Sequence, residues 1–87
     1  MADESVIEFP CEFPIKMMGR DTPEFRQTMR TIVESHAGHV DDSRVQSAVS
    51  RNGSFVSVTI TITATSQQQL DDIYREISAR DDVMMAL

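Results

Sequence analysis

The sequence predicts an α+β domain whose strands and helices follow the order βαββαβ. The 87 residues suffice for one hydrophobic core, since a chain of this length buries roughly 60–65% of its unfolded surface. Some segments alternate apolar and polar residues as strands do, and two others repeat apolar residues at helical spacing. An Asn-Gly pair at 52–53 separates two alternating segments and predicts a hairpin.

The chain enters its first strand after two prolines. Ile15 and Met17 alternate with Lys16 and Met18, which predicts a strand over about residues 13–18. A proline is tolerated at the start of a strand, because the missing N–H breaks no ladder there.

A helix over about residues 22–37 is predicted next. Asp21 or Thr22 can act as N-cap, Pro23 suits the first helical position, and Gly38 suits the C-terminal stop. The apolar residues of this segment recur at helical spacing and form one stripe: Phe25, Met29, Ile32 and Val33.

The second half of the chain repeats the pattern of strand, helix and strand. A weaker alternation begins at Val45, and a strict one runs over 55–64. Ser66 and Gln69 have the spacing of a capping box, which predicts a helix over about 66–79. A short apolar strand over 83–87 follows.

Two split β-α-β units fold most simply as a ferredoxin-like sandwich, a four-stranded antiparallel sheet with both helices on one face. The first and third strands are then central. The small hydroxyl residues of 55–64 line the open face: Ser57, Thr59, Thr61 and Thr63. The predicted core comprises Ile15, Met17, Phe25, Met29, Ile32, Val33, Val56, Val58, Ile60, Ile62, Leu70, Ile73, Tyr74, Ile77 and Val83.

Composition limits the classes of function. We expect residues 1–11 to form a mobile arm and residues 12–87 a single ferredoxin-like domain. The net charge of −6 argues against nucleic-acid binding, which draws its affinity from clustered Lys and Arg. No apolar run approaches the ~18 residues of a membrane span. A single cysteine, Cys11, and an acidic N-terminus unlike a signal peptide predict a cytoplasmic protein.

The sequence contains no recognisable catalytic or metal-binding motif. His36 and His39 lie three apart with Asp41 and Asp42 nearby, but Gly38 breaks the helix between the histidines and no third soft ligand follows. No serine or cysteine is placed with a histidine and a carboxylate by a known spacing. We therefore expect no enzymatic activity, no metal site and no cofactor.

One loop is a candidate ligand site. Gly19, Arg20, Asp21 and Thr22 lead directly into the N-terminus of the first helix, where free N–H groups and the helix dipole favour an anion. Ordinary helix capping is the simpler explanation of the same residues.

Several short segments, spread in order over nearly the whole chain, are characteristic when taken together: Phe9-Pro10, Phe13-Pro14, Lys16 to Gly19, Ser50 to Gly53, Ser57 to Thr61, Tyr74 and Val83 to Leu87. In the order and spacing of these segments the chain resembles the YbeD-like family of small bacterial proteins. The resemblance implies a ferredoxin-like fold similar to the amino-acid-binding regulatory (ACT) domains, a bacterial cytoplasm and a link to lipoate metabolism. It brings no catalytic or binding residues with it.

Two classes of function remain. One is a regulatory module that senses a metabolite at residues 19–22. The other is an adaptor that binds a protein through the open sheet face and the C-terminal edge strand, with weak self-association through the same surface. The residues expected at such an interface are Lys16, Met18, Thr59, Thr61, Met84 and Ala86.

Overall fold

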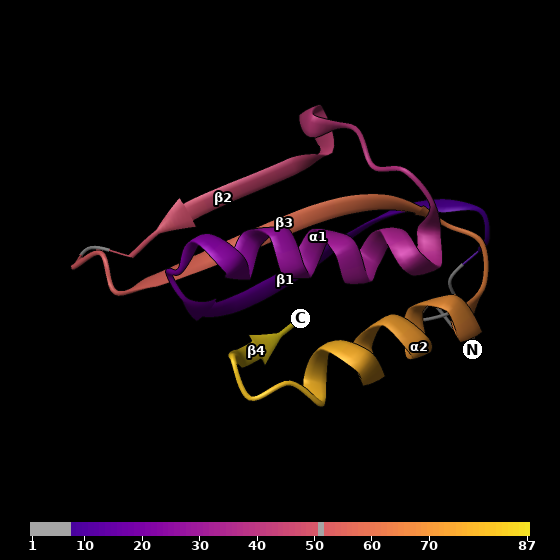
Figure 1. Cartoon of the computed structure of the whole chain (residues 1–87). Coiled ribbons are helices and arrows are strands. Elements are labelled where there is room, and N and C mark those ends of the chain that lie inside the picture. Colours follow the sequence, from indigo (N-terminus) through magenta and orange to yellow (C-terminus); the bar gives the residue numbers. More distant parts are fainter. Residues whose placement is uncertain (1–7, 51) are drawn as a thin grey trace, which may run out of the picture.

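The computed structural model describes residues 8–50 and 52–87. Its elements are β1 (Cys11–Arg20), α1 (Pro23–Ala37), a 3-10 turn η1 (Asp42–Arg44), β2 (Val45–Val49), β3 (Phe55–Ala64), α2 (Gln67–Ser78) and β4 (Val83–Ala86). The strands form one antiparallel sheet in the order β2-β3-β1-β4. Both helices lie on the same side of it (Figure 1). The predicted ferredoxin-like βαββαβ sandwich is therefore confirmed.

The first strand is longer than predicted. It begins at Cys11 and pairs along its whole length with β3, from Cys11 opposite Ala64 to Arg20 opposite Phe55. Phe9 and Cys11 pack against the core, and residues 1–7 of the expected arm lie outside those described. Only the second half of β1 pairs with β4, so the first half has a free edge on that side. Pro14 lies in this first half, where its missing N–H is tolerated.

Side chains cap the N-termini of both helices. The N–H of Phe25 donates to Thr22 Oγ1 (3.2 Å), so Thr22 and not Asp21 is the N-cap of α1. The N–H of Gln69 donates to Ser66 Oγ (3.1 Å) at the start of α2. In the described residues, no helix is long and apolar enough to cross a membrane.

The β2–β3 hairpin forms where the Asn-Gly pair predicts it. Ser50 N–H donates to the carbonyl of Phe55 (2.8 Å), so four residues separate these two. Gly53 has a φ of +77°, and no described non-glycine residue has a positive φ. Asn52 contributes through its side chain instead, because its Oδ1 accepts from Ser54 N–H (3.2 Å).

The core lies between the sheet and the helices, and most of the predicted core residues are buried there. Tyr74 and Val83 are only partly buried, whereas Val40 and Ala64 are buried but were not predicted. The hydroxyl of Tyr74 lies at the surface, where it donates to the carbonyl of Leu87 (2.6 Å). Burial of the ring raises the pKa of Tyr74 above its ordinary value.

Candidate functional site

The predicted ligand loop is filled by the chain's own groups. A Cβ at Gly19 would lie 2.4 Å from the carbonyl oxygen of Asp82 and 2.4 Å from the Phe25 ring. Thr22 is occupied in capping α1, and the carboxylate of Asp21 pairs with Arg26 (3.0 Å). The space beside Gly19 and the side chains of Asp21 and Thr22 are therefore engaged by groups of the chain itself.

The open face of the sheet divides into two halves, and the first is polar. Arg44 Nη1 lies 2.5 Å from Glu12 Oε1, and the Thr63 hydroxyl donates to Glu12 Oε2 (3.0 Å). The hydrogen bond from Arg44 lowers the pKa of Glu12. Arg44 also donates to the carbonyl of Thr61 (3.4 Å). The threonines of this half thus belong to a network that satisfies its own charges.

The second half of the open face is apolar. Met18, Phe55, Met84 and Met85, which we call the methionine patch, line a hollow of about 230 Å³ together with Ser50. Met84 is 63% exposed and Met85 49% exposed. The hollow is several times larger than the ~30 Å³ that a water molecule occupies in the liquid. It is therefore large enough to take an apolar side chain.

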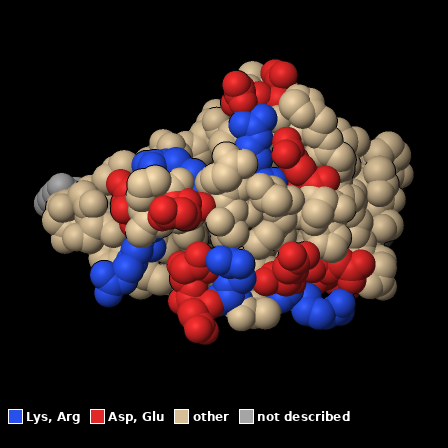
Figure 2. Space-filling view, viewed as in Figure 1, with Lys and Arg blue, Asp and Glu red and all other residues tan. Residues whose placement is uncertain are grey.

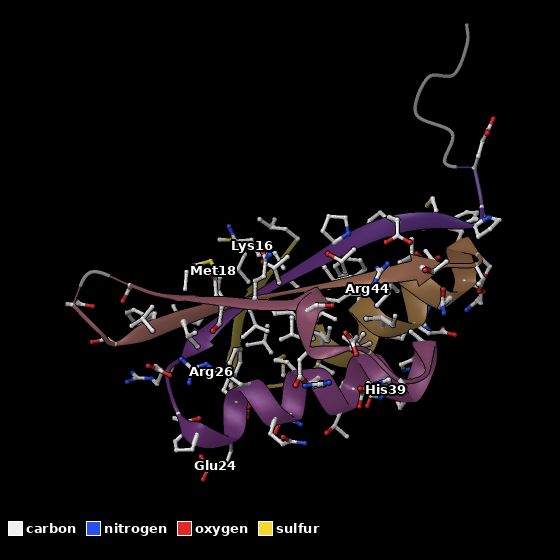
Figure 3. All side chains as sticks on the ribbon, turned by 90° about the horizontal axis from the view of Figure 1, so that it is seen from above. Lys16, Met18, Glu24, Arg26, His39 and Arg44 are labelled. Carbon is white, nitrogen blue, oxygen red and sulfur yellow. The ribbon has the colours of Figure 1, made fainter. Side chains whose placement is uncertain are left out.

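The hollow continues across the sheet as a shallow trough. A second hollow shares Met18 and Phe55 with it and extends to Ala48 on β2. A third shares Ala48 with the second and extends to Lys16 and Thr59. Figure 3 shows Lys16 and Met18 pointing away from α1, on the open side of the sheet. The trough therefore joins the predicted interface residues Lys16, Met18, Thr59 and Met84.

The expected position of Ala86 on the open face is wrong. The register pairs Met17 with Ala86, Met18 with Met85 and Gly19 with Val83, with a shift between Met18 and Gly19. Ala86 consequently packs against the core, and the alternation of the strand puts Met85 on the open side instead. An irregularity of this kind turns a side chain to the other face.

Two cations flank the methionine patch without an acidic partner. Lys16 and Arg20 alternate outward with Met18 along β1, and neither forms an ion pair with a described carboxylate. Every other described arginine is paired with an acid: Arg26, Arg30, Arg44, Arg75 and Arg80. Figure 2 shows the opposite face, over α1 and α2, where blue and red groups lie side by side.

The two histidines have separate roles in the structure. His36 Nε2 lies 2.8 Å from Glu76 Oε1 and links α1 to α2, whereas exposed His39 lies 3.8 Å from Glu34. Within the described residues, no three His, Cys, Asp or Glu side chains are grouped to hold a metal ion. The two histidines therefore contact different acidic residues.

Two residues of the site were not expected there from the sequence, Arg20 and Met85. Phe55, at the start of the predicted strand 55–64, pairs with Arg20 across the central strands and lies on the open face, as the alternation of that strand indicates. Arg20 was assigned to the helix entry because the predicted strand ended too early. Met85 had no local signal, since its orientation depends on the register shift.

Comparison with known proteins identifies relatives over almost the whole chain. The family described as "Protein of unknown function (DUF493)" matches residues 4–87. A UPF0250 protein of Paraburkholderia phytofirmans is 46% identical over 98% of this chain and 96% of its own length. A UPF0250 protein of Nitrosomonas europaea is 44% identical over the whole of both chains.

A solved structure shares the fold at low sequence identity. The solution structure of protein HP0495 from H. pylori matches with a TM-score of 0.70 and 18% identity, covering 100% of this chain and 94% of that one. At this identity the likeness concerns the fold alone. It agrees with the ferredoxin-like sandwich described above.

Proposed function

The chain belongs to the DUF493/UPF0250 family of small bacterial proteins, and from its own surface we propose that it is a non-catalytic cytoplasmic adaptor that binds a segment of another protein. The observation that carries the proposal is the methionine patch, an apolar hollow on the open face of an acidic protein. Methionine and aromatic residues are enriched at the centres of protein interfaces, and methionine adapts to the shape of a partner.

The size of the patch favours a moderate affinity. Full burial of one large apolar side chain contributes about 1.5–3 kcal/mol, and association costs several kcal/mol in lost freedom. Met84 and Met85 are exposed and Phe55 is half-buried, so a few anchors of this kind support a reversible complex. The edge strand β4 also lacks the charged side chains with which natural proteins usually protect an exposed edge.

The regulatory, metabolite-sensing alternative has less support from the geometry. At Gly19 the space beside the backbone is taken by Phe25 and Asp82, and Thr22 is occupied as a helix cap. A connection with lipoate metabolism rests on the resemblance to the YbeD-like family. Titration of amino acids and lipoate-related carboxylates into labelled protein tests this alternative, with shifts confined to residues 19–22 and lost in Arg20→Ala as its signature.

Crosslinked capture from bacterial cells tests the adaptor. We expect the wild-type protein to retain a reproducible partner and Met84→Lys to lose it, because a charge in the patch must be desolvated on binding. Ser78→Lys on α2 is the matched control, since it adds the same charge at an exposed position on the helix side. Equal capture by all three proteins would contradict the proposal.

A further inference from the structure

Lys16 and Arg20, which form no ion pair with a described carboxylate, indicate which charge a partner of the open face should carry. On the β3 side, Lys16 lies opposite Thr59 and Arg20 lies opposite Phe55, so neither has an acidic neighbour on that strand. The chain carries 14 acidic against 8 basic residues, yet the two described cations without an acidic partner lie on either side of Met18. Complementary charge at the rim of an apolar patch selects partners and accelerates their encounter.

On the basis of the proposed adaptor function, we propose that the docking segment carries apolar side chains flanked by two carboxylates, which Lys16 and Arg20 bind. Four residues on a strand span about 13 Å. Two carboxylates four residues apart in an extended segment match this span, with an apolar residue between them above Met18. In a helix the equivalent spacing is about nine residues.

Charge argues against a second copy of this chain as the occupant. A two-fold interface places the same patch of each copy against the other, which would bring the Lys16 and Arg20 pairs close together. Glu12, the acidic residue of β1 on this face, is already bound by Arg44. A membrane is also disfavoured, because a protein of net charge −6 is repelled by anionic lipids.

Selection of peptides from a random 12-residue phage library on the immobilised wild-type protein tests the inference. We expect enrichment of apolar residues flanked by acidic ones at one of the two spacings. A synthetic peptide from the selection should bind about tenfold more weakly to Lys16→Glu/Arg20→Glu, and its affinity should fall as salt rises. Arg26→Glu/Arg75→Glu changes the net charge equally, with one substitution on each helix, and should bind like the wild type.

The possible outcomes separate the inference from the proposed function. Peptides without acidic residues, lost in Met84→Lys but retained by Lys16→Glu/Arg20→Glu, would overturn the inference and leave the adaptor standing. A library that yields no peptide sensitive to Met84→Lys would overturn both. Concentration-dependent dimerisation that requires Met84, or binding to vesicles containing phosphatidylglycerol that requires Lys16, would overturn the inference in favour of a second copy or a membrane.

Discussion

Gly19 connects the fold to the candidate site, because its missing side chain lets β4 and α1 approach β1 together. A Cβ at this position would lie 2.4 Å from both the Asp82 carbonyl oxygen and the Phe25 ring. We expect Gly19→Ala to lower the free energy of unfolding by about 1–3 kcal/mol, the usual effect of overpacking, in urea denaturation.

Arg20→Ala provides the control for this substitution. Arg20 is exposed and makes no ion pair with a described carboxylate, so its removal should change the free energy of unfolding by less than about 0.5 kcal/mol. If Gly19→Ala were as stable as Arg20→Ala, the backbone at Asp82, in the turn before β4, would have to move easily.

The connection from α1 to η1 shows how side chains of a helix fix the loop that follows it. Glu34 Oε2 accepts the N–H of Val40 (2.9 Å), and Arg30 donates to the Val40 carbonyl. Arg30 also pairs with Asp42 (2.6 Å). These bonds satisfy both backbone groups of Val40, which allows a loop residue to be buried.

Glu34 makes this connection sensitive to acid. The hydrogen bond from Val40 lowers the pKa of Glu34 below its ordinary value of 4.5. A carboxyl group with a lowered pKa contributes stability above that ordinary value and loses it as the pH falls below it. We expect the melting temperature of Glu34→Gln to fall less than that of the wild type between pH 6 and about pH 3.

A matched variant separates this effect from general acid unfolding. Glu24 lies exposed in the first turn of α1 and forms no ion pair with a described cation, so Glu24→Gln should keep the wild-type pH dependence. If the two variants lose stability in parallel with the wild type, Glu34 does not contribute to the acid response.

The elements with strong local signals could be predicted from the sequence. The bounds of β3 agree with the predicted strand 55–64, and α1 begins one residue after the predicted start, since alternation and caps are properties of neighbouring residues. The length of β1 depends instead on its pairing with β3. Val40 escaped prediction because its burial requires Glu34 and Arg30 to bind its backbone.

The site was predicted in part for the same reason. The open face and the residues Lys16, Met18 and Met84 follow from the alternation of strands within a known fold. The position of Met85, rather than Ala86, on the open face does not follow from alternation, because it arises from a register shift between two segments that are distant in sequence. The free charges of Lys16 and Arg20 could be recognised only after the pairing of the other described arginines was known.

The strands of the sheet differ in how much of their length is paired, and the edge strand β4, which is proposed to contact a partner, is paired least. β1 and β3 pair over their full length, from Cys11 to Arg20, whereas β4 pairs with β1 over a short stretch with a shifted register. Regions with few buried contacts open locally at low cost in free energy. We expect amide hydrogen exchange to be slowest in the central strands, for example at Met17 and Val58, and much faster at Met84 and Met85.

Binding of a partner at the methionine patch should slow amide hydrogen exchange in β4. An occupant that covers Met84 and Met85 raises the free energy of opening of the strand beneath it. Slower exchange confined to β4 and the adjoining part of β1, upon addition of a selected peptide, would place the partner on this surface. Protection of β4 equal to that of β3 in the free protein, lost on dilution, would instead show that a second copy already covers the edge.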